Sequence, residues 1–136
     1  MNWKLKAIIQ NFVDKLPKSL AYPVYYKIQR NFGGLKRINP YEHLKKSVFF
    51  INAIKKQNYQ LVDKTFLEIG TGRTVSTPIG LWLCGASRII TVDLNPYLKK
   101  ELIIESIEWI RQHKNEVRCL FRDFEKHHCL IIGFII

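Results

Sequence analysis

The first sixty residues carry apolar side chains at three- and four-residue intervals, the spacing that places them along one face of a helix. Residues 3–16 keep this interval and Pro17 ends it, which predicts an amphipathic helix. Its repeating apolar positions are Leu5, Ile8, Ile9, Phe12, Val13 and Leu16. A second, shorter helix is expected at about 23–31, closed by a left-handed cap and turn at Gly33-Gly34.

A third helix is predicted from Asn39 to about Gln57. Asn39 can accept a hydrogen bond from a free amide at the helix start, and Pro40 suits the first helical position. Glu42 is spaced to reach back to the capping residue. The first sixty residues are therefore expected to be helical.

After residue 63 the pattern changes to short apolar runs that alternate with helical stretches. The predicted elements are strands at 65–69, 88–92 and 116–121, a helix at 78–84 closed by Gly85, and a helix at 98–113 that starts after Asn95-Pro96. This order is typical of an α/β fold with a partial doubly wound parallel sheet. We therefore expect a helical N-terminal segment at 1–60, on the lid or substrate side, and a partial α/β domain at 61–136.

Basic residues are concentrated in the predicted helical segment. Residues 1–60 hold twelve Lys or Arg against Asp14 and Glu42, so they carry +10 of the formal net charge of +11. Such an imbalance indicates contact with an anionic partner, whether a phosphate-bearing substrate, nucleic acid or an acidic membrane surface. The alternative is that the lysines are solvated helix faces, because most of them flank apolar positions at helical spacing.

Cysteine content and hydropathy bear on the compartment. Cys84, Cys119 and Cys129 form an odd set without Cys-x-x-Cys spacing, so we expect reduced thiols and a cytoplasmic protein. Lysines interrupt the apolar positions at the N-terminus, unlike those of a secretion signal. The apolar run 129–136 is far shorter than the roughly twenty residues that span a bilayer.

No catalytic or metal site is predicted from the histidines. Adjacent His127 and His128, with Cys129, offer zinc-ligating atoms, but neighbouring residues rarely chelate one ion and no second pair follows. His43 and His113 fall near helix ends and are expected at the surface. The catalytic residues therefore stay unknown at this stage.

Candidate binding residues lie in the loops after the predicted strands, because the ligand crevice of a parallel α/β sheet is at the carboxyl ends of the strands. After Glu68, Gly70 and Gly72 lack side chains, so the backbone can turn sharply and approach a ligand. Asp93 ends the next strand, where a carboxylate can accept hydrogen bonds from the ribose hydroxyls of an adenosine cofactor. Asp123 follows the third predicted strand.

Two classes of cofactor use this arrangement. A dinucleotide site, as in an NAD-dependent oxidoreductase, uses Gly-x-Gly-x-x-Gly, and Val75 stands at the third glycine position here. Glu68 would also repel a pyrophosphate, whereas it suits a cofactor with an ammonium and a sulfonium. The pattern favours the second class, and the NAD-binding Rossmann oxidoreductase remains the alternative.

The stretch Phe66-Leu-Glu-Ile-Gly-Thr-Gly-Arg, followed by Gly85-Ala-Ser-Arg-Ile-Ile-Thr-Val-Asp-Leu-Asn, resembles motif I and the next acidic motif of class I S-adenosylmethionine-dependent methyltransferases. The resemblance spans about 64–124, under half of the chain. It implies a Rossmann-like transferase that binds S-adenosyl-L-methionine. The implied cofactor contacts are Glu68, Gly70, Thr71 and Gly72 along the methionine moiety and sugar, Asp93 on the ribose hydroxyls, Leu94 on the adenine face, and Asp123 on the adenine amino group.

The chain departs from the family pattern in two respects. Thr74 stands where the family has a third glycine. A complete domain of this class has about seven strands, and we predict three, with Leu130–Ile136 as either a fourth strand or an unrelated stretch. We therefore expect a truncated form, which lacks the later strands that carry the family's substrate-site residues. Its exposed sheet edge would favour a homodimer, and the methyl acceptor, anionic or otherwise, is unknown.

A function of a different class is a non-catalytic fragment or binding module that docks on anionic lipid or nucleic acid. The helix at 3–16 favours it, because apolar side chains lie on one side with lysines near them.

Overall fold

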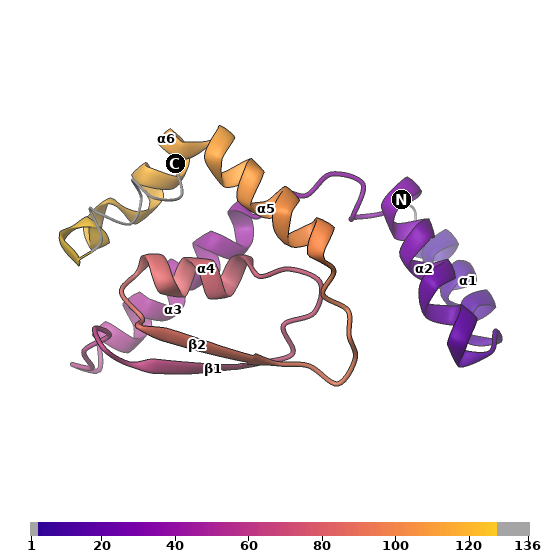
Figure 1. Cartoon of the computed structure of the whole chain (residues 1–136), viewed down its shortest axis with the longest axis horizontal. Coiled ribbons are helices and arrows are strands. Elements are labelled where there is room, and N and C mark those ends of the chain that lie inside the picture. The colour runs from indigo at the N-terminus through magenta and orange to yellow at the C-terminus, as the bar shows by residue number, and fades with distance from the viewer. Residues whose placement is uncertain (1–2, 128–136) are drawn as a thin grey trace. The chain divides into compact units, whose positions relative to one another are not determined.

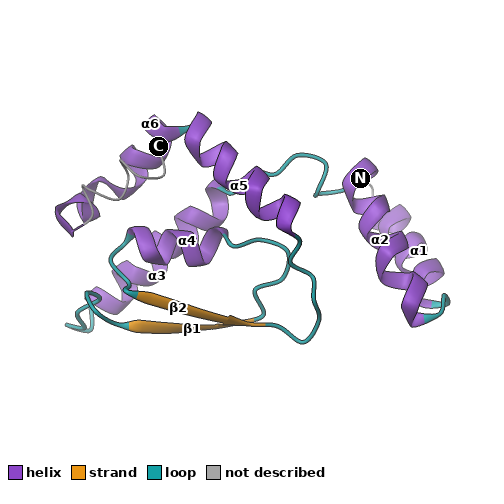
Figure 2. Cartoon of the chain, in the orientation of Figure 1, coloured by secondary structure: helices purple, strands orange, loops and turns teal. Residues whose placement is uncertain are grey.

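The structure, a computed structural model, describes residues 3–127 (Figures 1 and 2). The chain divides after Ile38 into two compact units, and each is described by itself. Among the described residues, no helix is both long and apolar enough to cross a membrane.

The first unit is a pair of helices, α1 (Trp3–Asp14) and α2 (Lys18–Phe32). The amide of Gln10 donates a hydrogen bond to the Tyr25 hydroxyl at 3.3 Å and so joins the two helices. The prediction of α1 is confirmed. α2 is longer than predicted, because Pro23 lies inside the helix, where it removes one backbone donor, rather than near its start.

The turn after α2 is not left-handed, contrary to the prediction. Gly33 has a φ of −114°, and its amide donates to the Gln29 carbonyl at 3.1 Å. A Cβ atom added to Gly33 would lie 2.9 Å from the Gln29 Cα, closer than van der Waals contact permits. The glycine is therefore required by a close approach rather than by a positive φ.

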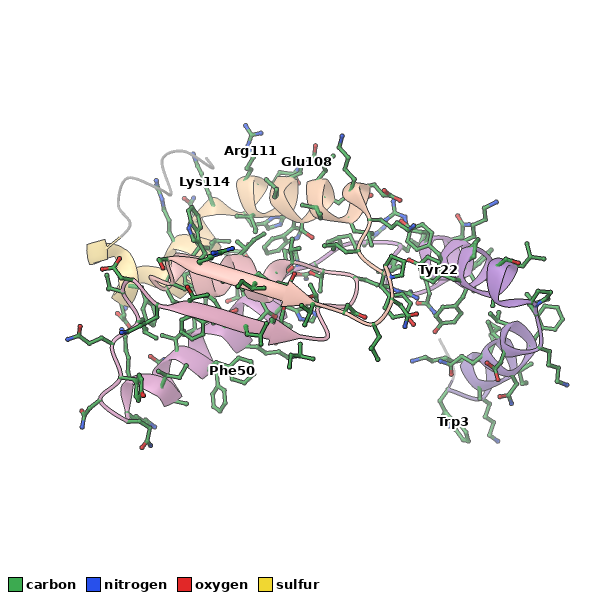
Figure 3. The ribbon with its side chains drawn as sticks, turned by 60° about the horizontal axis from the view of Figure 1, so that its bottom comes forward. Trp3, Tyr22, Phe50, Glu108, Arg111 and Lys114 are labelled. Atoms are coloured by element: carbon green, nitrogen blue, oxygen red, sulfur yellow. The ribbon has the colours of Figure 1, made fainter. Side chains whose placement is uncertain are left out.

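The second unit is a mixed α/β arrangement, as predicted. Its elements are α3 (Tyr41–Lys55), β1 (Thr65–Ile69), α4 (Ser76–Leu83), β2 (Arg88–Val92), α5 (Lys100–Gln112), α6 (Lys114–Phe121) and the 3-10 helix η1 (Arg122–His127). β1 and β2 pair in parallel, with Thr65 opposite Arg88 and Ile69 opposite Val92. In the described part of the chain these two strands form the sheet, and helices lie on one of its faces (Figures 1 and 3).

The other face of the sheet is open, although short apolar runs such as β1 and β2 are typical of strands buried on both faces. Leu67 and Ile69 of β1 are 63% and 80% exposed, and Ile90 and Val92 of β2 also lie exposed. These four side chains form two cross-strand pairs, Leu67 with Ile90 and Ile69 with Val92. A contiguous apolar surface results.

The start of α3 agrees in part with its predicted cap. Asn39 Oδ1 accepts the Tyr41 amide N–H at 3.0 Å, as an Asn at a helix start does. Glu42 does not reach back to the cap, because its carboxylate lies 3.5 Å from the Lys45 ammonium in the next turn.

The core of the second unit forms where α3 crosses α4. The buried Ser47 hydroxyl lies within hydrogen-bonding distance of the carbonyls of His43, 3.1 Å away, and of Thr77, 3.0 Å away. Gly80 permits this approach, because an added Cβ would lie 2.6 Å from the Ser47 Cβ. Apolar side chains from several elements complete the core: Leu44, Ile51, Leu61, Leu81, Leu83, Cys84, Ala86, Ile110, Val117, Phe121 and Phe124.

The third predicted strand is wrong, since Lys114–Phe121 is the helix α6. Val117 and Phe121, one helical turn apart, are both buried. Asp123 therefore follows no strand and lies exposed in η1. The Lys55 ammonium lies 4.0 Å from the Phe124 ring, which places η1 against the end of α3 (Figure 1).

The helix α5 begins later than the predicted start at residue 98, and Asn95-Pro96 lies in the preceding loop. The expected fourth strand at Leu130–Ile136, and His128 and Cys129 of the suggested metal ligands, lie outside the described residues.

Candidate functional site

The loops after β1 and β2 meet at the carboxyl end of the sheet. The Gly70 amide donates to the Val92 carbonyl at 2.8 Å, which extends the parallel pairing by one step. Beyond it, the Gly72 amide donates to Asp93 Oδ2 at 2.7 Å. The structure thus brings the glycine loop and Asp93 together.

Two glycines allow the first loop to take its path. Gly70 has a φ of +85° and Gly72 a φ of +69°, a region that residues with side chains rarely adopt. No atom lies within 4 Å of the position that a Gly70 Cβ would occupy. The left-handed backbone, and not crowding, is therefore what requires a glycine at 70.

Asp93 is exposed, but both of its oxygens accept backbone donors. Oδ1 accepts the Asn95 amide at 3.1 Å, and Oδ2 accepts the Gly72 amide. The Asn95 and Gly72 amides, in that order, hold the pKa of Asp93 below its usual value, with a smaller contribution from the Leu94 amide. A carboxylate oxygen can accept two hydrogen bonds, so Asp93 retains capacity for further donors such as hydroxyls.

Glu68 and Thr71 place two polar atoms without partners beside the glycines. Glu68 is half-buried, and burial raises the pKa of its carboxyl, an effect that the nearby Thr71 hydroxyl partly opposes. Glu68 Oε2 and Thr71 Oγ1 are nevertheless buried without a hydrogen-bond partner in the described part of the chain. Buried polar atoms of this kind are costly, so this pair of side chains gains from a closer contact with each other or from a bound polar group.

Of the two remaining predicted cofactor contacts, Leu94 lies at this cluster and Asp123 does not. Leu94 directly follows Asp93 and is 99% exposed, so its side chain offers apolar surface rather than core packing. Asp123 does not join the cluster, because η1 lies at the end of the sheet where β1 and β2 begin (Figures 1 and 3). Its assignment depended on the third strand, which the structure replaces with α6.

Two features of the loops were missed by sequence reasoning. The Thr74 hydroxyl accepts the Ser76 amide at 3.2 Å and lies 2.5 Å from the Ser76 hydroxyl, so it satisfies a free donor at the start of α4. A hydroxyl residue just before a helix is a recognisable signal for such a cap. The Arg73 guanidinium lies 5.6 Å from the Tyr97 ring, and no local sequence pattern indicates this contact between separate loops.

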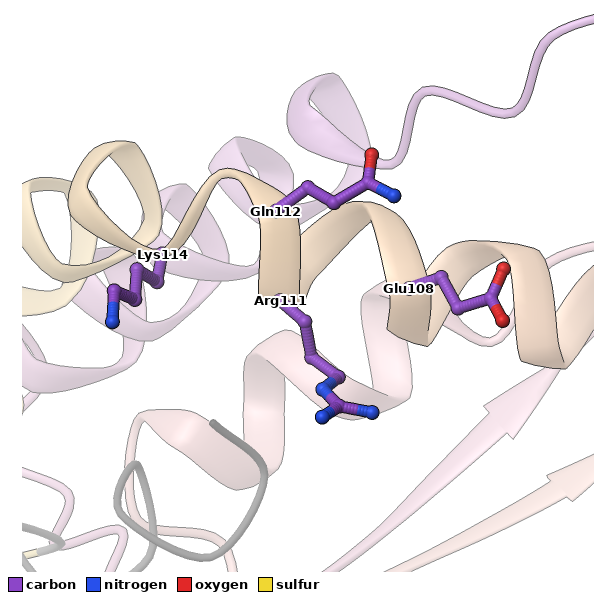
Figure 4. A pocket seen from close by; sticks show the side chains of 4 residues that line it. All are labelled: Glu108, Arg111, Gln112 and Lys114. Carbon is purple, nitrogen blue, oxygen red and sulfur yellow. The ribbon is translucent and has the colours of Figure 1, made fainter.

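Two hollows lie away from this cluster. An open depression of about 470 Å³ is lined by Glu108, Arg111, Gln112 and Lys114, whose side chains point in different directions (Figure 4). They do not converge on a common point. A second hollow, of about 600 Å³, includes Lys64, Thr65 and Phe66 and so lies at the start of β1, opposite the end that carries Asp93.

Nucleophilic and metal-ligating side chains do not gather near Asp93. Burial raises the pKa of the Cys84 thiol to about 12, so it is a poor nucleophile, and Cys119 is exposed on α6. The His113 ring stacks on Trp109 with centroids 3.9 Å apart. Within residues 3–127, no group of three His, Cys, Asp or Glu side chains could hold a metal ion.

The cluster at the carboxyl end of the sheet therefore combines an exposed, ionised carboxylate with a half-buried carboxyl, a buried hydroxyl and two left-handed glycines. It can accept hydrogen bonds and attract positive charge. Comparisons with family models, with curated proteins and with solved structures found no match to this chain.

Proposed function

We propose that the carboxyl ends of β1 and β2 bind S-adenosyl-L-methionine, and that the chain is the cofactor-binding part of a class I methyltransferase. One observation carries the proposal. The hydrogen bond from Gly72 to Asp93 holds an ionised carboxylate next to a loop in which Glu68 Oε2 is buried without a partner. The methyl acceptor is not assigned.

Each residue of the cluster has a role that its chemistry suits. Asp93 has acceptor capacity left for the ribose hydroxyls. Glu68 and Thr71 would take the polar groups of the methionine moiety, since a buried carboxylate attracts an ammonium or sulfonium. Gly70 permits close approach of the backbone, and Leu94 would pack on the adenine face. Asp123 has no part in this proposal.

The protein's own contribution to the reaction is binding and orientation. S-adenosylmethionine, when bound, supplies a methyl group made electrophilic by its sulfonium. Methyl transfer then requires a nucleophile held in line with the carbon-sulfur bond and water excluded. A base for a protonated acceptor is not assigned to any described residue.

The competing proposal of a dinucleotide site is weaker. A pyrophosphate binds where backbone amides and a helix N-terminus face it without a nearby negative charge. Here the Gly72 amide already donates to Asp93, and the Ser76 amide at the start of α4 donates to Thr74. Two amides that a pyrophosphate would use are thus occupied.

Isothermal titration calorimetry of the chain with S-adenosylmethionine, S-adenosylhomocysteine and NAD tests the proposal. We expect both adenosyl ligands to bind and NAD not to. Asp93→Ala should weaken S-adenosylhomocysteine binding about tenfold or more, since hydrogen bonds to a charged group are worth about 1.5–3 kcal/mol each. Asp123→Ala, which also removes an exposed aspartate, is the matched control and should bind as the parent does. Binding of NAD alone would overturn the proposal.

A further inference from the structure

The helix α1 presents an apolar face that the first unit does not cover. Leu5, Ile8 and Phe12 are 50%, 65% and 63% exposed. Their spacing of three and four residues puts them on one face of the helix. A contiguous row of large, exposed apolar side chains on a surface is typical of a site that contacts another protein or a membrane.

A different face of α1 packs against α2. Val13 is buried, and Gln10 donates its hydrogen bond to Tyr25 of α2. At about 100° per residue these two positions lie well away from the row formed by Leu5, Ile8 and Phe12. One side of α1 therefore packs against α2, and a separate apolar side is exposed.

The first unit, which carries this face, is strongly positive. Residues 1–38 contain eight Lys or Arg and a single acid, Asp14, for a net charge of +7. Lys4 falls on the helix next to the exposed apolar row, by the same 100° step, and Lys15 follows directly after the last residue of α1. Trp3, 73% exposed, projects from the start of α1 with the Lys4 ammonium 5.8 Å from its ring (Figure 3).

We propose that α1 lies on an anionic lipid surface, with Leu5, Ile8 and Phe12 at the acyl boundary and the neighbouring lysines among the headgroups. A helix with an apolar face flanked by Lys, and an aromatic residue at its end, is the arrangement that binds in the plane of a membrane interface. The proposed contact is peripheral, because α1 would lie in the plane of the interface.

The same observations disfavour other occupants of the face. Nucleic acid would be attracted by the lysines, but phosphates gain nothing from the exposed aliphatic chains of Leu5 and Ile8. If two copies of the chain met through this face, two segments that each carry a net charge of +7 would lie together. Repulsion between like charges opposes that contact. An anionic lipid surface satisfies both the charge and the apolar row.

Vesicle co-sedimentation of the full chain tests this inference. We expect binding to phosphatidylcholine vesicles that contain phosphatidylserine, weak binding without phosphatidylserine, and loss of binding as salt is raised. The double variant Ile8→Gln, Phe12→Ala should bind at least about tenfold more weakly, because two apolar side chains no longer enter the lipid. Phe49→Ala, which removes a 70% exposed phenylalanine from α3, is the matched control and should bind as the parent does.

Each other outcome counts against the inference. Equal binding by the double variant, with an unchanged far-ultraviolet circular dichroism spectrum, would overturn it. Binding to single-stranded oligonucleotides but not to vesicles would assign the charge to nucleic acid instead. The readout does not depend on S-adenosylmethionine, so failure here and failure of the proposed cofactor site are distinguishable.

Discussion

The Asp93 carboxylate accepts the Gly72 amide N–H at 2.7 Å, so one hydrogen bond ties the loop after β1 to the loop after β2. The second carboxylate oxygen accepts the Asn95 amide at 3.1 Å. Both bonds favour the ionised form and lower the pKa of Asp93 from its ordinary value of 3.8. Asp93 thus fixes the shape of the loops that would hold a cofactor, as well as supplying a negative charge.

Asp93→Asn should remove an acid-dependent part of the stability. Because the folded pKa lies below the unfolded one, the stabilisation from Asp93 is complete above pH 3.8 and is lost as the pH falls through the lowered pKa. Urea unfolding at a series of pH values should show the parent and variant converging below about pH 4. A stability difference that does not vary with pH would contradict this origin, and Asp123→Asn serves as the control.

Glu68→Gln should have opposite effects on stability and on cofactor binding. Burial raises the pKa of Glu68, so its contribution to stability is present below its ordinary value of 4.5 and is lost as the pH rises through the raised pKa. At neutral pH the glutamine variant, which carries no charge, should unfold at a higher urea concentration than the parent. Its affinity for S-adenosylhomocysteine should fall, since the attraction for the ligand ammonium is gone. Glu116→Gln on the exposed side of α6 is the matched control.

Proton release on binding provides a second readout for Glu68. A cationic ligand group beside the carboxyl stabilises its ionised form, so binding should release protons near the raised pKa. Calorimetry in buffers of different ionisation enthalpy measures this release. Its absence in the parent protein would argue against contact between Glu68 and the ligand cation.

The positions of β1, β2 and the loops that follow them could be predicted, because the local sequence pattern in these segments matches the folded structure. β1 and β2 each combine a short β-rich run with a glycine or aspartate at the end, and parallel pairing then brings Gly72 and Asp93 to one edge. Burial of the strands was not predictable in the same way. It depends on what covers each face, and the helices of the second unit lie on one face.

The prediction of a strand at 116–121 was wrong because the sequence of this segment fits both a strand and a helix. Val117, Cys119 and Phe121 stand at every second position, which is typical of a strand. The helix α6 instead buries Val117 and Phe121, four residues apart, and η1 then buries Phe124, while Cys119 is exposed. The spacing of Val117, Phe121 and Phe124 was the sequence signal that favoured a helix. Packing of these side chains against the core stabilises the helix over a strand.

The start of α5 was misplaced for a local reason. Asn95-Pro96 has the residue types of a helix start, but the Asn95 amide is already bound by Asp93. The chain therefore turns at this point, and α5 begins at Lys100.

Gly80→Ala should destabilise the second unit. The added Cβ would lie 2.6 Å from the Ser47 Cβ, so α3 and α4 must separate or the Ser47 hydroxyl must move away from the Thr77 carbonyl. Overpacking of this kind costs about 1–3 kcal/mol, which thermal or urea unfolding would detect. Gly34→Ala is the matched control, because nothing lies within 4 Å of its added Cβ and its φ is not positive. Equal stability of the two variants would show that the crossing is looser than the structure indicates.

The open face of the sheet leads to a prediction about self-association. Leu67 and Ile69 of β1 lie opposite Ile90 and Val92 of β2, and all four are exposed. An apolar surface of this kind, next to unpaired strand edges, favours contact with another copy. We expect the sedimentation coefficient of the chain to rise with concentration, and Leu67→Lys to suppress the rise by placing a charge in the middle of the face. Ile104→Lys introduces the same charge at a 44% exposed position on α5 and should leave the concentration dependence intact. Suppression by both variants would show that net charge, rather than this face, governs association, and a parent that stays monomeric would remove the basis for the prediction.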